Sequence, residues 1–249
     1  MSDFTYNCVF AVGYSIISVS SDPVVLHADR AKRQGAYILA ANHLSPFDVP
    51  LLMAHTRRHL DFMSIVEMQR IKWVRRLYDR MNCFYVDRSR RDPGAVHAAL
   101  DRLARGRVVA MFPESGIQSW ETSVLNGGAI RPGVAKLAQM ADVPVVPAVV
   151  LGSSDYVHAR NWLPLRRTRV GVIFGEPMKV GKEGDRDELR GTFLAQLKQT
   201  MVALSRELNE AMRRHHGVAP LPEQLADKVN DIAAPFAPCP EPAPPLHSP

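Results

Sequence analysis

Hydrophobic residues along this chain form short runs that alternate with segments of helical spacing. The runs typical of strands are residues 36–41, 83–86, 108–112, 143–151 and 170–174. The segments with helical spacing are residues 49–54, 71–81, 95–104, 133–140 and a long amphipathic stretch over 187–215. Strands that alternate with helices predict an α/β fold, a mostly parallel sheet flanked by helices. The apolar doublets within 143–151 fit a strand buried on both faces.

The two ends of the chain differ in composition from this middle region. Residues 8–19 are largely apolar but contain Gly13, Ser15 and Ser18, so they fall short of the roughly 18 uninterrupted apolar residues that cross a bilayer. Asp3 stands where a signal peptide carries basic residues. Nine of the nineteen prolines fall in the last thirty residues. We therefore expect an N-terminal apolar segment over 1–30, a main domain over 31–216, and a Pro-rich tail over 217–249 that is disordered or loosely docked.

The N-terminal segment allows two interpretations. It is either a buried first helix or strand, or an interfacial segment that places Phe4, Phe10, Tyr14 and Ile17 in lipid.

Charge and cysteine content narrow the class of protein. The net charge is +6, and residues 57–91 alone carry ten Lys or Arg against four acidic residues. This local excess indicates an anionic partner such as a phospholipid surface, nucleic acid or a phosphorylated substrate. The three cysteines, at positions 8, 83 and 239, show neither a disulfide framework nor the spacing of a zinc site. Such usage fits a reducing cytosolic environment.

His43 and Asp48 follow the predicted strand over 36–41, at the end where open α/β sheets place their ligands. One interpretation is purely structural, because Ser45, Pro46 and Asp48 suit the N-cap, first and third positions of a helix with a capping box. The other is catalytic. A turn at this point would let the Asp48 carboxylate bind one ring nitrogen of His43, while the other nitrogen takes a proton. Since no G-x-S-x-G segment marks a protein nucleophile, the proton would come from a substrate hydroxyl.

Two other predicted strands end in residues of chemical interest. The strand over 108–112 runs into Pro113, Glu114, Ser115 and Gly116, and the strand over 83–86 runs into Asp87 and Arg88. On the residues alone, Glu114 could be a solvated side chain in an ordinary turn, and Arg88 one more surface cation.

Together these segments resemble the glycerolipid acyltransferases, the family of 1-acylglycerol-3-phosphate acyltransferases and their relatives. The resemblance rests on four ordered blocks between about residues 36 and 180. They are Asn42 to Asp48 (His-x4-Asp), Phe84 to Arg88, Phe112-Pro113-Glu114, and Val143 to Pro147. Two further segments, Arg131-Pro132-Gly133 and Phe174 to Pro177, match a helix start and a later turn of the family.

The resemblance implies an acyltransferase that uses acyl-CoA or an acyl-carrier protein as co-substrate, with no cofactor and no metal. It implies that His43 is the general base on the acceptor hydroxyl and that Asp48 orients it. It also implies that Arg88 binds an acceptor phosphate, with Glu114, Ser115, Gly116 and Arg131 as further substrate-binding residues.

The chain departs from the family where Gly-Thr-Arg-Ser is expected and residues 115–118 read Ser-Gly-Ile-Gln. The missing arginine is a phosphate ligand in the family, and Ile117 cannot replace its N–H donors. Either Arg131, Gln118 or another neighbour compensates, or the acceptor is a lyso-aminolipid or glycolipid without that phosphate, or activity is lost and a silent lipid-binding protein remains. Thioester hydrolysis is a lesser alternative.

The basic stretch over residues 70–81 predicts an amphipathic helix that is either a solvated face or an interfacial surface. In the second case its Lys and Arg meet anionic headgroups, with Trp73 and Tyr78 at headgroup depth. No nucleic-acid-binding motif accompanies the charge. We expect a peripheral or interfacial protein on the cytoplasmic face of the cell membrane, with a lysolipid acceptor and no nucleic acid among its partners.

Overall fold

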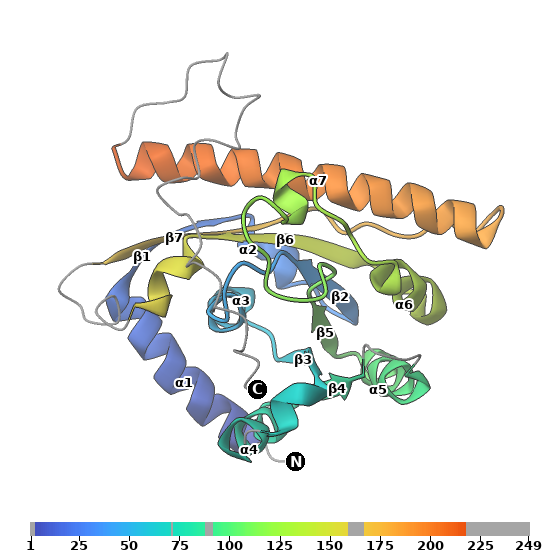
Figure 1. Ribbon diagram of the computed structural model, residues 1–249, viewed down its shortest axis with the longest axis horizontal. Coiled ribbons are helices and arrows are strands. Elements are labelled where there is room, and N and C mark those ends of the chain that lie inside the picture. The colour runs from blue at the N-terminus through green and yellow to red at the C-terminus, as the bar shows by residue number, and fades with distance from the viewer. Residues whose placement is uncertain (1–2, 71, 88–91, 159–166, 218–249) are drawn as a thin grey trace, which may run out of the picture.

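The computed structural model describes residues 3–70, 72–87, 92–158 and 167–217, in which strands and helices alternate (Figure 1). The strands are β1 (Ser21–Leu26), β2 (Tyr37–Ala41), β3 (Leu60–Ile65), β4 (Phe84–Val86), β5 (Val108–Met111), β6 (Val145–Leu151) and β7 (Thr168–Phe174). The α-helices are α1 (Asp3–Ser20), α2 (Ala28–Ala31), α3 (Asp48–Thr56), α4 (Lys72–Arg80), α5 (Pro93–Ala104), α6 (Gly133–Ala141) and α7 (Arg186–His215). Three short 3₁₀ helices, η1 (Val66–Arg70), η2 (Val124–Asn126) and η3 (Ser153–Val157), lie in the connections.

The seven strands form one sheet in the order β1-β7-β6-β2-β5-β3-β4. The five strands from β6 to β4 are parallel to one another. Strand β7 is antiparallel to β6, and β1 pairs parallel with β7. The predicted α/β class with a mostly parallel sheet is therefore confirmed.

Both faces of the sheet are covered, because its central strands are apolar on both sides. In β2, Ile38 and Ala40 face one hydrophobic cluster, whereas Tyr37, Leu39 and Ala41 face another. Residues from α5, α6 and α7 fill the first cluster, and residues from α1 and α3 fill the second. Figure 1 shows α7 lying along one side of the sheet and α1 on the other. The alternation of side chains in each strand thus builds a three-layer arrangement.

Two strands were not predicted from the sequence, and each contains a residue that weakens a strand pattern. Strand β1 contains Pro23, which is tolerated because β1 lies at the edge of the sheet. Strand β3 contains Asp61, which is fully buried. Its carboxylate accepts two 2.6 Å hydrogen bonds from the Arg107 guanidinium and lies 3.4 Å from Nε of Arg102. These ion pairs allow a carboxylate to occupy a core position, where the sequence alone suggests a loop.

The N-terminal segment is a helix that packs on the sheet and also exposes an apolar face. Tyr6 and Ile17 are buried in the hydrophobic cluster that contains Tyr37, Leu39 and Ala41 of β2, and Phe10 is partly buried against it. Of the residues proposed for lipid contact, Ile17 therefore faces the core, and the side chain of Phe4 lies outside the described part. Tyr14, which was also proposed for lipid contact, is exposed, as are Val12, Ile16 and Val19.

Since β1 belongs to the sheet, the fold takes in residues ahead of the domain boundary at residue 31 that the sequence suggests. Within the described ranges, no helix has the length and apolar character needed to cross a membrane. The predicted Pro-rich tail lies outside the described residues, apart from Gly217.

Candidate active site

The candidate site is built at the carboxyl ends of three neighbouring parallel strands, β6, β2 and β5. Asn42 directly follows β2, and its fully buried side-chain amide bridges to β6. It donates to the Val150 carbonyl at 2.9 Å and accepts from the Val150 N–H at 2.8 Å. This paired contact holds the chain as it leaves the sheet and so positions the next residue, His43.

His43 and Asp48 are brought together as the sequence predicts. Nδ1 of His43 lies 2.9 Å from Oδ2 of Asp48, which also accepts the backbone N–H groups of Leu44 at 2.8 Å and Ser45 at 2.9 Å. The Asp48 side chain is fully buried and the His43 side chain is 15% exposed. A buried carboxylate with three donors is held in one orientation, so it fixes the imidazole ring and leaves Nε2 as the nitrogen that can exchange a proton.

The His43 ring is also held from one face. It stacks on Phe112 with ring centroids 3.9 Å apart and an interplanar angle of 11°. Phe112 follows β5, so the ring is clamped between its own turn and the neighbouring strand end. Among the described residues, Nε2 of His43 has no hydrogen-bond partner, which leaves it available to a substrate hydroxyl.

The structural interpretation of this turn holds in part. Ser45 N–H donates to Asp48, which is one half of a capping box, but the Ser45 hydroxyl accepts from Phe47 N–H and donates to the Ser153 carbonyl. The α-helix begins at Asp48, two residues later than the predicted start at Pro46. Capping and orientation of His43 therefore use the same carboxylate, and the two roles are compatible.

Glu114 is a buried clamp beside His43. Its Oε2 accepts the His43 backbone N–H at 2.8 Å, and its Oε1 accepts both the Ser123 hydroxyl and the Val124 N–H at 2.6 Å. Burial raises the pKa of this carboxyl, against the three hydrogen bonds that favour its charged form. Because both oxygens bind groups of the chain itself, Glu114 acts on the candidate site by fixing the backbone of His43.

The segment that departs from the family pattern folds over the same turn. Gln118 N–H donates to the His43 carbonyl at 2.8 Å, so the loop and the His43 turn are hydrogen-bonded to each other. Ser115 adopts φ 65° and Gly116 φ 153°, both values that favour glycine. Ser115 and Gly116 are half-buried, whereas the Ile117 side chain is 53% exposed. The loop thus places an apolar side chain in solvent at the position where the resemblance implies a phosphate-binding arginine.

The remaining predicted substrate-binding residues are placed less directly. The Arg131 backbone N–H donates to the Pro113 carbonyl at 2.8 Å, so the Arg131 backbone lies beside the residue that precedes Glu114. The Arg131 side chain is exposed. Arg88 lies outside the described residues. Strand β4, which leads to it, is separated from β2 by β5 and β3, or about 14 Å at a strand spacing of about 4.8 Å.

Three residues of the site were missed by sequence reasoning as contributors to its geometry: Asn42, Phe112 and Ser123. Asn42 adjoins the candidate base, which is the one signal that could have marked it. The role of Ser123 depends on a loop that returns to Glu114 nine residues later, and no spacing rule predicts that contact.

The fold and the site together define an α/β protein with a carboxylate-oriented histidine at the carboxyl edge of its parallel strands. A family model described as Acyltransferase matches residues 23–151, a little over half of the chain. The chain therefore belongs to the Acyltransferase family and is an acyltransferase.

Individual relatives agree with this family. The 1-acyl-sn-glycerol-3-phosphate acyltransferase of Bacillus subtilis (strain 168) is 25% identical over 164 residues, which cover 66% of this chain and 77% of that protein. The probable 1-acyl-sn-glycerol-3-phosphate acyltransferase of Mycoplasma pneumoniae is 25% identical over 158 residues, which cover 57% of each chain. The crystal structure of the 1-acyl-sn-glycerophosphate (LPA) acyltransferase PlsC from Thermotoga maritima superposes with a TM-score of 0.61 at 20% identity, over 80% of this chain and 81% of that one. This last similarity shows the shared fold.

Proposed function

We propose that this acyltransferase moves an acyl chain from an acyl thioester to the free hydroxyl of 1-acylglycerol-3-phosphate, a step of phospholipid biosynthesis. The observation that carries the proposal is the pair formed by His43 and Asp48, with Nδ1 held at 2.9 Å from a fully buried carboxylate. The two relatives named above act on this acceptor by their names, and the family supplies the reaction type.

The proposed reaction needs no protein nucleophile. Nε2 of His43 takes the proton of the acceptor hydroxyl as its oxygen forms a bond to the thioester carbonyl carbon. Asp48 stabilises the imidazolium that results. The tetrahedral intermediate then breaks its C–S bond, and the leaving thiolate takes the proton from His43. The products are the ester and the free thiol of CoA or of a carrier protein, and His43 is regenerated.

The acceptor phosphate is proposed to bind the basic groups near the carboxyl edge of the sheet. Arg131 is suited to this role because its backbone is tied to Pro113 beside Glu114 and its guanidinium is exposed. The resemblance assigns Arg88 the same role. These two arginines would compensate for the position now held by Ile117.

Exposure of Ile117 favours a second candidate, an acceptor without the glycerol phosphate, such as a lyso-aminolipid or glycolipid. An acceptor panel separates the two candidates. Purified protein is incubated with one long-chain acyl-CoA or one acyl-carrier protein and each lysolipid in turn, and the release of free thiol is followed. We expect the highest kcat/KM with lysophosphatidate, and Ile117→Arg to raise it modestly. Turnover with a phosphate-free acceptor and none with lysophosphatidate would support the second candidate, especially if Ile117→Arg then gained lysophosphatidate activity.

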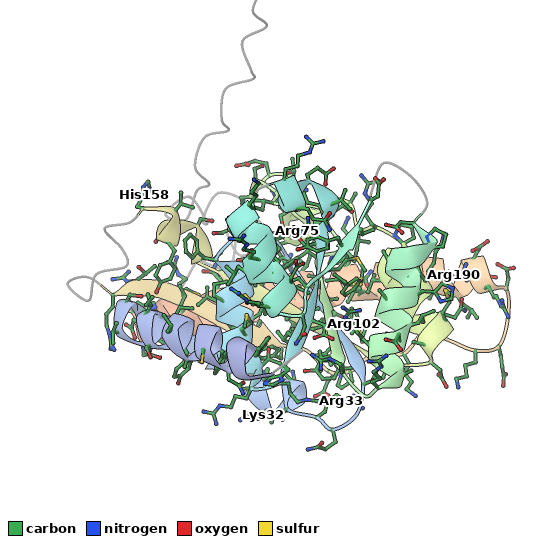
Figure 2. The ribbon with its side chains drawn as sticks, turned by 90° about the horizontal axis from the view of Figure 1, so that it is seen from below. Lys32, Arg33, Arg75, Arg102, His158 and Arg190 are labelled. Carbon is green, nitrogen blue, oxygen red and sulfur yellow. The ribbon has the colours of Figure 1, made fainter. Side chains whose placement is uncertain are left out.

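We further propose that the protein binds the membrane peripherally through the face that carries α1 and α4, on the cytoplasmic side. Figure 2 shows both helices on this face, with Arg75 on α4. Helix α1 exposes Val12, Ile16 and Val19, and α4 exposes Lys72, Arg75, Arg76 and Arg80. Apolar side chains beside a basic helix suit an anionic lipid surface. The Trp73 side chain lies outside the described residues, so its expected headgroup contact stays a prediction.

Sedimentation with vesicles tests the membrane proposal. Binding to vesicles that contain anionic lipid should weaken as salt rises from about 0.05 to 0.5 M, since exposed charges are screened. Arg75→Glu should weaken it further, whereas the matched change Arg206→Glu on α7, across the sheet, should not. Equal binding to neutral and anionic vesicles at every salt concentration would contradict the electrostatic part.

A further inference from the structure

Three potential metal ligands meet where the end of α7 reaches the start of β1. Nε2 of His215 lies 3.1 Å from Oδ1 of Asp22, and Nδ1 of His216 lies 3.4 Å from Oδ2 of the same carboxylate. One ligand atom from each residue lies within 4.8 Å of the other two. Asp22 and His215 are 193 residues apart, so the fold brings them together and no spacing in the sequence indicates the cluster.

Each imidazole nitrogen lies close to one of the two oxygens of Asp22, at about the spacing of two ligands on one metal ion. Zinc binds imidazole nitrogen and carboxylate oxygen at about 2.0–2.1 Å, so two ligands of a tetrahedral ion lie about 3.3 Å apart. The two measured separations, 3.1 and 3.4 Å, lie on either side of that value. Two histidines and one carboxylate form a common three-ligand set for zinc, in which water takes the fourth position.

The cluster is held in place before any ion binds. The His216 side chain is 5% exposed, and its backbone N–H donates to the Met212 carbonyl at 3.0 Å. The His215 and His216 rings meet edge to face with centroids 4.8 Å apart. A surface ion pair needs one histidine with one carboxylate, as in the 2.8 Å pair of His27 with Glu207, but here a second, buried histidine converges on the same carboxylate.

The local charges have opposing effects on a bound cation. The cluster lies at the carboxyl end of a 30-residue helix, whose partial negative charge favours a cation. A metal ion binds the charged carboxylate and the neutral imidazole, so its binding competes with protons. Arg167 faces Asp22 and Arg169 faces His216, and both positive charges reduce the affinity for a dication.

We propose that Asp22, His215 and His216 form a binding site for Zn²⁺ or a similar transition-metal dication, which ties the end of α7 to the edge strand β1. Nitrogen ligands select such ions over Mg²⁺ and Ca²⁺, which prefer oxygen ligands. Strands β7 and β6 lie between β1 and β2, the strand that leads to His43, so we expect an ion at this site to stabilise the fold and to take no part in acyl transfer.

Thermal unfolding of the full chain, first treated with a chelator and then dialysed, tests this proposal. Zn²⁺ at about 100 times its dissociation constant should raise Tm by about 5–10 °C, and Mg²⁺ at the same concentration should not. Co²⁺ should give visible absorption bands of tetrahedral coordination. Asp22→Asn keeps the size of the side chain and should abolish both effects, as should His216→Ala. His27→Ala is the matched control, since it removes a histidine–carboxylate pair between the same parts of the fold, and it should keep both effects.

Each variant is compared with itself in the presence and absence of metal, so any intrinsic loss of stability cancels. A wild-type protein without a zinc-specific rise in Tm would overturn the proposal. A rise that persists in the combined variant of Asp22→Asn, His215→Ala and His216→Ala would do so as well, because it would place the ion elsewhere, for example at Cys239 or His247.

Discussion

Replacing Glu114 by Gln separates a positioning role from a substrate-binding role at this site. The carboxylate accepts three hydrogen bonds, one on Oε2 from His43 N–H and two on Oε1 from Ser123 and Val124. Glutamine has one oxygen acceptor and one NH₂ donor. If its oxygen stays with the two donors on the Oε1 side, its NH₂ group faces the His43 N–H across a contact of 2.8 Å in the parent structure, and two donors oppose each other.

The size of the effect follows from that lost contact. A hydrogen bond to a charged group contributes about 1.5–3 kcal/mol, and part of this is offset because the buried charge is removed. We expect Glu114→Gln to reduce the free energy of unfolding by about 1–2 kcal/mol, or Tm by about 2–8 °C. Because His43 would shift at its backbone, we also expect kcat to fall about 10- to 100-fold while the KM of the acceptor changes little.

Steady-state kinetics over a range of acceptor concentrations and a urea titration measure both effects. Ser123→Ala is the matched control, since it removes one donor from Oε1 and leaves the bond to His43 in place. It should lower stability by about 1 kcal/mol and leave kcat within a few-fold of wild type. A rise in acceptor KM with unchanged kcat in Glu114→Gln would refute the positioning role and assign Glu114 a direct contact with the acceptor.

Three further predictions concern stability. Burial raises the pKa of the Glu114 carboxyl above its ordinary 4.5, so the stability gained from its protonation is largest below about pH 4.5 and is lost as pH rises through the folded-state pKa. The urea midpoint of wild type should therefore decline over this pH range, and that of Glu114→Gln should not. Identical pH profiles of the two proteins would contradict this. Gly152 has φ 77°, and an added Cβ would lie 2.1 Å from the Arg169 carbonyl oxygen, so Gly152→Ala should lower the free energy of unfolding by about 2 kcal/mol or more in a urea titration. Gly191 lies in open space on α7, so the control Gly191→Ala should raise it by about 0.5–1 kcal/mol. Arg107→Ala leaves the buried Asp61 with a weaker partner and should lower the free energy of unfolding by about 3 kcal/mol in the same titration. It should not change kcat, because the pair lies at the amino ends of β3 and β5 and His43 lies at the carboxyl end of β2. A loss of stability below about 0.5 kcal/mol would contradict this.

Most of the fold could be predicted from the sequence because its pattern is local. The apolar run of β6 predicts a buried strand, and the periodic apolar positions of α7 predict a helix with one buried face. The structure confirms the bounds of both elements to within two residues. Strand β3 was missed because burial of Asp61 depends on Arg107, which lies 46 residues away. A charged residue within a strand indicates a loop as long as its ion-pair partner is not known.

The candidate site divides in the same way. His43 and Asp48 were predicted together because a single turn joins them, five residues apart. The contacts of Glu114 with His43, at a separation of 71 residues, and of Asn42 with Val150, at 108, depend on how β5, β2 and β6 are ordered. Helical periodicity also left open which side of α1 is exposed, and the packing of Tyr6 and Ile17 decides it.

The central claim is that Nε2 of His43 takes the acceptor proton while Asp48 orients and stabilises the ring. Its most direct test is the rate of thiol release from acyl-CoA or acyl-carrier protein with lysophosphatidate, compared among wild type, His43→Ala and Asp48→Asn. General acid–base catalysis contributes about 10²- to 10⁴-fold, so His43→Ala should lose at least about 10²-fold in kcat with the fold intact by circular dichroism, and Asp48→Asn should fall between the two. A His43→Ala variant that retains wild-type turnover of any accepted lysolipid would contradict the account.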